Sequence, residues 1–140
     1  MVSPIVTINY LAVLAATLAS MFIGFLWYGP IFGKTWMKLM NFDKKKMDDA
    51  KKKGMAKTYF VMILFSFITS YVLAHFVDYV GATTIGSGIQ LAFWLWLGFI
   101  VPVLLGSVLW EGKPVKLYFI NVFHYLVSFI VMTTILVLWI

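Results

Sequence analysis

Four long apolar segments constrain the fold of this chain more than any other feature. They cover roughly residues 5–28, 59–80, 89–110 and 117–139, and none of them contains lysine or arginine. A transmembrane helix needs about 20 mostly apolar residues to cross roughly 30 Å of hydrocarbon. Lipid offers no hydrogen-bond partners to the backbone, so such segments are expected to be helices. The sequence therefore predicts an all-α integral membrane protein, with four transmembrane helices in a single membrane domain over residues 1–140.

Composition supports this class and removes several kinds of chemistry. Hydrophobic residues make up 63% of the 140 residues and charged residues only 11%, whereas soluble domains are about a quarter charged. Cysteine is absent, which excludes disulfides, thiolate metal sites and cysteine nucleophiles. The two histidines lie in different segments without metal-ligand spacing, and no cofactor motif or catalytic set is recognisable. No catalytic residue, metal or cofactor is therefore predicted.

Lysine placement predicts which side of the membrane each loop faces. Nine of the 11 lysines lie between residues 34 and 57, and the other two, Lys113 and Lys116, lie in the third loop. The second loop, residues 77–87, contains no lysine. Because short cytoplasmic loops retain lysine and arginine, both basic loops are expected in the cytoplasm and both termini outside. The protein is thus expected to be a multi-pass protein of the cell membrane.

The lysine-rich segment, residues 32–57, is the one sizeable soluble part of the chain. Asp43 can cap a helix that begins at Lys44 and runs to Lys53. Its lysines favour anionic lipid headgroups at the cytoplasmic face, and a surface for acidic partners is the alternative. Nucleic acid is not expected as a partner, because the basic run is tethered beside the bilayer and matches no nucleic-acid-binding module. The expected headgroup-binding residues are Lys44, Lys45, Lys46, Lys51, Lys52 and Lys53.

Two rows of small residues predict close packing between helices. Association in lipid depends on close packing and interhelical hydrogen bonds. Pro102 cannot donate to the carbonyl of Gly98, which predicts a kink in the third segment. A row that is not filled within one chain would serve self-association or contact with another membrane protein. The rows are Ala12, Ala16, Ser20 and Gly24 in the first segment, and Gly98, Pro102 and Gly106 in the third.

Two short matches in the same order indicate an internal repeat. Residues 26–30 resemble residues 109–114, and residues 57–61 resemble residues 116–120. One interpretation is a duplicated helical hairpin with both copies inserted the same way. The other is that Trp, Gly, Pro and Lys recur at helix ends for interfacial and capping reasons. In this alignment one copy alone gains polarity, since Met62 corresponds to Asn121, Phe65 to His124 and Tyr28 to Glu111.

Polar residues of the fourth segment are the main candidates for a functional site. Asn121, His124 and Ser128 stand at i, i+3 and i+7, which places them on one helix face. Polar groups at membrane depth are costly and mark functional sites, although an ordinary interhelical hydrogen bond is the alternative for His124. Glu111 either faces this polar stripe or pairs with Lys113 in solvent. The expected aromatic wall of the site consists of Trp27, Tyr28 and Trp110.

A second polar pair lies near the outer end of the second segment. His75 and Asp78 stand at i and i+3, so they share a helix face. They form either a proton or cation contact at the extracellular mouth, or two side chains solvated at the membrane interface.

Three stretches carry a resemblance to a known family. They are Leu-Trp-Tyr-Gly-Pro at 26–30, Phe-Gly-Lys-Thr-Trp-Met at 32–37, and Leu-Trp-Glu-Gly-Lys-Pro at 109–114 running on to Asn121. Through them the chain resembles, over essentially its whole length, a prokaryotic membrane family catalogued as domain of unknown function 1761. The resemblance implies a small four-helix membrane protein and brings no activity with it. The positions that it marks are Trp27, Tyr28, Pro30, Trp36, Glu111, Gly112, Pro114 and Asn121.

Three functions are compatible with these patterns. The first is a homo-oligomeric membrane module that binds or passes a small solute or proton through a polar site near the cytoplasmic side, with Glu111 as the titrating group. The second is an accessory subunit that docks on a larger membrane complex through its small-residue faces. The third is a membrane enzyme acting on a lipid or quinone, with Glu111 and His124 as acid and base. The added polarity of one repeat half favours the first.

Overall fold

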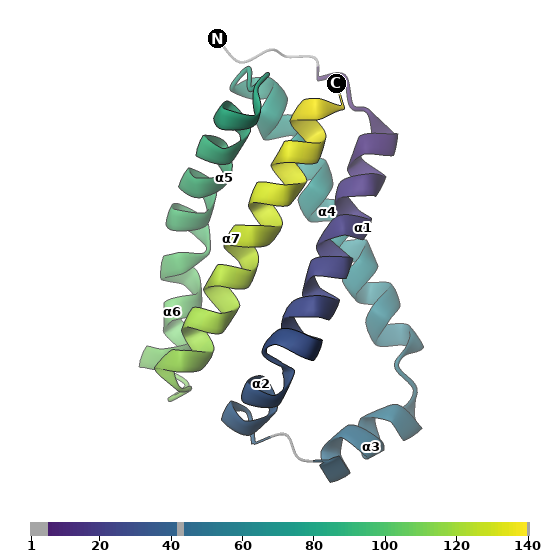
Figure 1. The fold of residues 1–140 in the computed structure, drawn as a ribbon, viewed down its shortest axis with the longest axis vertical. Helices are drawn as coiled ribbons and strands as arrows, with labels where there is room; N and C mark the ends of the chain where they lie inside the picture. Colours follow the sequence, from purple (N-terminus) through teal and green to yellow (C-terminus); the bar gives the residue numbers. More distant parts are fainter. Residues whose placement is uncertain (1–5, 42–43, 140) are drawn as a thin grey trace.

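Four long helices dominate the computed structural model, which describes residues 6–41 and 44–139 apart from the side chains of Lys44 and Met47. The helices Tyr10–Ile31, Ala56–Tyr79, Ile85–Leu109 and Val115–Leu138 are each long and apolar enough to span a membrane (Figure 1). Each overlaps one predicted segment, and no strand occurs in the described ranges. The predicted all-α class with four spanning helices is therefore confirmed. The duplication of a helical hairpin stays a prediction.

The first long helix begins later than predicted and ends in an unusual turn. Helix α1 (Tyr10–Leu26) begins at Tyr10 because the Asn9 side chain accepts hydrogen bonds from the backbone N–H groups of Leu11 and Ala12. Ile5, the predicted start, lies outside the described residues. It continues as the π-helical turn η1 (Trp27–Ile31), in which the Phe32 N–H donates to the Trp27 carbonyl at 2.9 Å. Pro30 inside η1 has no N–H for an ordinary helical bond, so a wider turn accommodates it.

The lysine-rich segment folds into two short helices. These are α2 (Gly33–Leu39) and α3 (Lys44–Lys53), so the helix predicted over 44–53 is confirmed, while its predicted cap, Asp43, lies outside the described residues. We call the end of the bundle that holds α2, α3 and the turn between Leu109 and Val115 the lysine end, and the opposite end, where α1 begins, the terminal end (Figure 1). Which side of a membrane each end faces stays a prediction.

The third spanning helix is broken at the predicted kink. It consists of α5 (Ile85–Phe99) and α6 (Val101–Leu109), and the interruption at Ile100 lies two residues before Pro102, which stands in the first turn of α6. The kink predicted from Pro102 is thus confirmed, because proline lacks the N–H that would continue the helical ladder. The last helix, α7 (Val115–Leu138), begins directly after Pro114.

The larger buried core lies in the half of the bundle next to the terminal end, which we call the terminal half. There α4 (Ala56–Tyr79) packs against α1 and α7, and the Ser70 hydroxyl donates to the Val13 carbonyl at 2.8 Å across the α1–α4 contact. Such interhelical hydrogen bonds and close contacts hold helices together where lipid competes equally for apolar side chains. The buried hydrophobic residues of this core are Ala12, Val13, Ala16, Leu73, Val77, Ala82, Met132, Leu136 and Val137.

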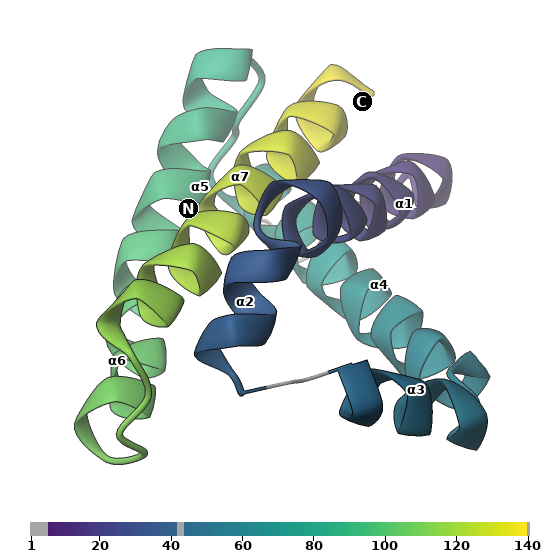
Figure 2. The same cartoon turned by 60° about the horizontal axis from the view of Figure 1, so that its bottom comes forward.

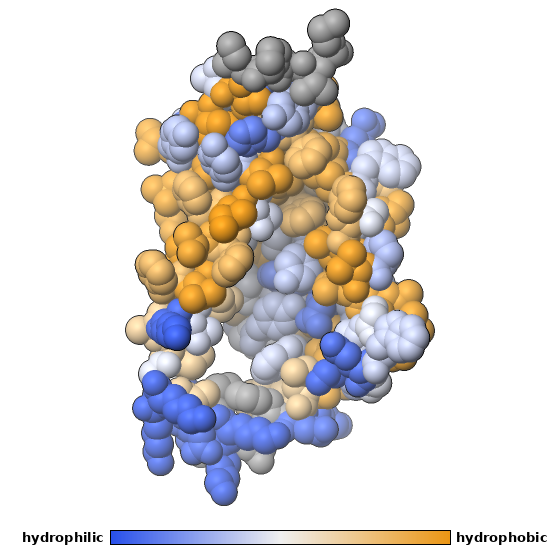
Figure 3. Space-filling view, turned by 180° about the vertical axis from the view of Figure 1, so that it is seen from behind, coloured by the Kyte–Doolittle hydropathy of each residue, from blue (hydrophilic) through white to orange (hydrophobic). Residues whose placement is uncertain are grey.

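In the half of the bundle next to the lysine end, which we call the lysine half, α4 diverges from the other helices. Residues 56–65 are all exposed, and Figure 2 shows α4 diverging from α7 towards α3. The space-filling view of Figure 3, seen from behind, shows a recess between α4 and the α5–α6 helix, with pale and blue side chains at its floor. The divergence of one helix therefore uncovers an inner face of the bundle at the lysine end.

Candidate functional site

The turn η1 brings two consecutive aromatic residues onto α7. The Trp27 indole N–H donates to the Ile120 carbonyl at 2.9 Å, and the Tyr28 hydroxyl donates to Oδ1 of Asn121 at 2.7 Å. Ridge-into-groove packing alone would not align η1 so closely with two successive residues of α7. These bonds fix the aromatic pair beside the first turns of α7.

His124 lies one turn further along α7, against the same aromatic pair. Its ring centroid is 5.0 Å from that of Tyr28 and 6.2 Å from that of Trp27. Its Nε2 lies 3.5 Å from the Ser128 hydroxyl, and its Nδ1 is buried with no hydrogen-bond partner among the described residues. A buried polar atom without a partner costs about 1–3 kcal/mol, and such atoms are retained at functional sites.

Two glycines let the chain approach this group closely. A Cβ on Gly33 would lie 2.8 Å from the carbonyl oxygen of Tyr28, a distance that backbone atoms cannot tolerate. Gly33 therefore lets α2 begin directly under η1, where the Trp36 ring meets the Tyr28 ring edge-on at 6.2 Å. On α1, a Cβ on Gly24 would lie 3.6 Å from Nε2 of His124, an ordinary contact distance, so α1 passes directly beside the imidazole at this point.

The polar residues lie on the face of α7 that α4 leaves uncovered. Asn121, Tyr125, Met132 and Leu136 share one side of the helix by the periodicity of 3.6 residues per turn. In the terminal half this side is core, since Met132 and Leu136 are buried under α1 and α4. In the lysine half Asn121 is half-buried and Tyr125 is 37% exposed. We call Tyr28, Asn121, His124 and Tyr125 together the polar recess.

Comparison with known proteins identifies the family of this chain. The family described as "Protein of unknown function (DUF1761)" matches residues 11–137. The chain belongs to the DUF1761 family. No curated protein and no solved structure matches the chain. The family assignment agrees with the resemblance seen in the sequence, and the matched range contains every residue of the polar recess.

Two predicted site residues of this DUF1761 chain lie apart from the polar recess. Trp110 is 89% exposed and Glu111 is exposed, and among the described residues no hydrogen bond, ion pair or ring contact joins either to the recess. The reason is the turn after α6, in which Gly112 has φ +67° and the Lys113 N–H donates to the Ser107 carbonyl at 3.0 Å. This glycine-capped ending directs both side chains outward. Of the predicted aromatic wall, Trp27 and Tyr28 meet the polar stripe and Trp110 does not.

The two small-residue rows of the DUF1761 chain face different surroundings. Ala12 and Ala16 are buried against the bundle, and Ser20 and Gly24 are half-buried further along α1. The row on the third helix faces mostly away from the bundle. Gly98 and Pro102 are exposed, and Gly106 is half-buried. A Cβ on Gly98 would meet nothing within 4 Å. The first row thus packs within the chain, whereas most of the second faces outward.

Sequence reasoning missed the glycine through which α5 packs on α7. A Cβ on Gly88 would lie 3.1 Å from Cγ2 of Val137, so the two helices touch closely at this point. Gly88, Ala92 and Trp96 are all buried and stand four residues apart. The spacing of Gly88 and Ala92 was the signal, because two small residues four positions apart follow the same periodicity as the other two rows.

The predicted headgroup-binding lysines lie on α3, which crosses the lysine end below the recess (Figure 3). Lys45, Lys46 and residues 51–53 are exposed, and the Lys46 ammonium donates to the Asn41 carbonyl at 3.0 Å. The side chain of Lys44 lies outside the described residues.

The polar recess offers neutral hydrogen-bonding groups. Tyr28 and Tyr125 carry hydroxyls, Asn121 an amide, and His124 an imidazole with one unpaired nitrogen. In the part of the chain that the structure describes, no three His, Cys, Asp or Glu side chains gather in a way that could hold a metal ion. The arrangement can bind an uncharged polar group or relay a proton between neutral groups.

Proposed function

We propose that this DUF1761 protein binds a small hydrogen-bonding solute at the polar recess and exchanges it, or a proton, with the side of the membrane that the lysine end faces. One observation carries the proposal. The path of α4 leaves open one face of α7 in the lysine half, and this part of the face carries polar residues where the terminal half carries buried core residues. Polar groups exposed on a half-open face inside a spanning bundle are costly unless something polar occupies that face.

The solute is expected to be uncharged. No Asp, Glu, Lys or Arg belongs to the polar recess, and bringing an unpaired charge against apolar helices is strongly unfavourable. With the Asn121 oxygen occupied by the Tyr28 hydroxyl, the Asn121 amide N–H groups are left to donate. A carbonyl, ether or hydroxyl oxygen on the solute would accept from them.

Entry is expected through the opening between α4 and the α5–α6 helix. Figure 3 shows this opening continuing down to α3, where the exposed lysines lie. We propose that these lysines bind anionic lipid headgroups on the cytoplasmic side, as positive charges beside a bilayer do. Bound in this way, α3 would hold the mouth of the recess at the level of the headgroups.

Native mass spectrometry of the protein released gently from its own membrane tests this proposal. The wild type should retain a small molecule of defined mass, and Tyr28→Phe and Asn121→Leu should each lose it. Removing one hydrogen-bonding group at such a site costs about 1–3 kcal/mol, or about five- to 150-fold in affinity.

Tyr59→Phe is the matched control, because Tyr59 is exposed on the diverging part of α4 and should leave the bound molecule unchanged. A wild-type protein that carries no small molecule, or a molecule retained equally by both recess variants, would refute the proposal.

The outward row on the third helix supports self-association as part of this proposal. Gly98 and Pro102 leave the backbone of that helix open to close approach by another helix. The same mass spectrum separates the two forms of assembly. Multiples of the 16.0 kDa chain would support a homo-oligomer, whereas release with a larger foreign complex would support the accessory-subunit function instead.

A further inference from the structure

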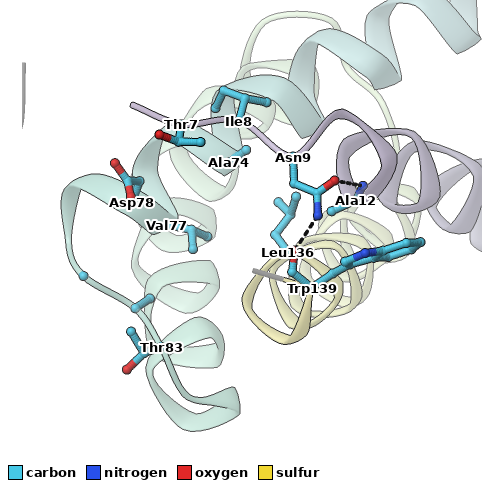
Figure 4. Close-up of a pocket in the computed structure, with 12 residues that line it drawn as sticks. Thr7, Ile8, Asn9, Ala12, Ala74, Val77, Asp78, Thr83, Leu136 and Trp139 are labelled. Atoms are coloured by element: carbon cyan, nitrogen blue, oxygen red, sulfur yellow. Dashed lines mark hydrogen bonds between the residues drawn. The ribbon is translucent and has the colours of Figure 1, made fainter. Parts of the chain in front are cut away.

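A separate cavity lies at the terminal end, on the opposite side of the core from the polar recess (Figure 4). Its volume is about 300 Å³, near the lower limit of small-molecule sites. Four segments enclose it: the chain before α1, the end of α4, the turn between α4 and α5, and the end of α7. None of the residues of the polar recess lines it.

The inner wall of this cavity is apolar and rigid. Ala12, Val77 and Leu136 line it and are buried members of the terminal-half core. Asn9 holds two of the enclosing segments together, since its Oδ1 accepts from the N–H groups of Leu11 and Ala12 while its Nδ2 donates to the Trp139 carbonyl at 2.9 Å. A cavity with walls fixed in this way is organised before a ligand arrives, which lowers the entropic cost of binding.

Among the described residues that line the cavity, Asp78 is the one with a side-chain carboxylate. Figure 4 shows Asp78 and Thr7 along one edge, across from Asn9, with the indole of Trp139 pointing away. Asp78 is the only Asp, Glu, Lys or Arg of the sequence outside residues 34–57 and 111–116. It therefore has no lysine or arginine of its own half to pair with, and His75, three residues before it on α4, has its Nδ1 2.8 Å from the Tyr71 carbonyl.

These features select a ligand that has one positive charge and a compact apolar body. An anion would be repelled by Asp78, and a neutral apolar molecule would leave the carboxylate unused. A metal ion would need more ligands, and no cluster of three metal-ligating side chains occurs among residues 6–41 and 44–139. We propose that the cavity binds a small organic ammonium ion, with the ammonium on Asp78 and the hydrocarbon between Val77 and Leu136.

A pair of probes of equal shape tests this proposal. Saturation-transfer NMR on the protein in phosphatidylcholine nanodiscs is measured with benzylammonium and, separately, with neutral benzyl alcohol. Benzylammonium should bind saturably and about fivefold more tightly than benzyl alcohol, the size of effect that an exposed ion pair provides.

Two variants and one control locate the effect. Asp78→Asn should bring the two affinities together, and Ala74→Leu should block both probes by filling the cavity that Ala74 lines. Asp48→Asn removes an exposed carboxylate from α3 at the lysine end and should change nothing. Circular dichroism and gel filtration show whether each variant is folded.

Three outcomes would overturn the proposal. They are equal binding of the two probes by the wild type, a charge preference that survives in Asp78→Asn, and no saturable binding of either probe. Because Tyr28→Phe and Asn121→Leu do not touch this cavity, a failure here leaves the proposed function of the polar recess standing, and the converse also holds.

Discussion

One face of α7 passes through both halves of the bundle, and its two parts differ in what covers them. In the terminal half α4 lies on this face, and the residues on it, Met132 and Leu136, are buried. In the lysine half α4 has left, and the same face carries Asn121 and Tyr125. The residue types on this face of α7 therefore change at the point where α4 no longer covers it. Where the partner helix departs, this face of α7 carries half-buried or exposed polar side chains in place of buried apolar ones.

The largest expected effect is a difference in the free energy of unfolding between substitutions in the packed half of α4 and substitutions in its diverging half. Leu73 is 3% exposed and Leu64 on the same helix is 47% exposed. Leu73→Ala should lower the free energy of unfolding by about 2–3 kcal/mol through the cavity that it leaves. This is the lower part of the usual range, because lipid also solvates the leucine of the unfolded chain.

Reversible unfolding in mixed micelles, followed by circular dichroism, measures this difference. Leu64→Ala, which changes the same residue type, should cost less than about 0.5 kcal/mol. Equal losses at the two positions would mean that α4 packs along its whole length and that no open half exists.

A smaller effect is expected where α2 meets η1. Gly33→Ala places a Cβ 2.8 Å from the Tyr28 carbonyl and should lower the free energy of unfolding by about 1–2 kcal/mol. By displacing Tyr28 it should also weaken retention of the bound solute. Gly29→Ala is the control, because a Cβ there meets nothing within 4 Å. If both variants behaved like the wild type, Gly33 would have no part in positioning Tyr28.

The smallest effect concerns the point where α4 begins to diverge. Ser70→Ala removes the 2.8 Å hydrogen bond to the Val13 carbonyl and should cost about 0.6 kcal/mol, the average for interhelical bonds in membranes. Ser66→Ala should cost less, because its partner is the weakly accepting sulfur of Met21 at 3.4 Å. The same unfolding titration measures both. A larger loss at Ser66 than at Ser70 would place the divergence closer to the lysine end.

Part of the candidate site was predictable from helical periodicity. The spacing of Asn121, His124 and Ser128 put them on one face of α7, and the structure places Trp27 and Tyr28 against that face. The wider turn around Pro30, and with it the bond from Tyr28 to Asn121, could not be predicted, because it depends on a local break of helical geometry. The glycine-capped turn after α6 leaves Trp110 and Glu111 exposed, which for Glu111 agrees with the solvent-exposed one of the two placements that the sequence allowed.

Three features follow from the amino-acid sequence without knowledge of the packing: four membrane-length helices, a kink in the third helix at Pro102, and a lysine helix at one end. Length, hydropathy and proline act locally, so they can be read without knowing which helices touch. The packing of α4 on one half of α7, with the other half left open, is seen only in the folded structure. The crossing of two helices depends on the summed shape of both surfaces, and the polar recess and the cavity beside Asp78 both follow from that crossing.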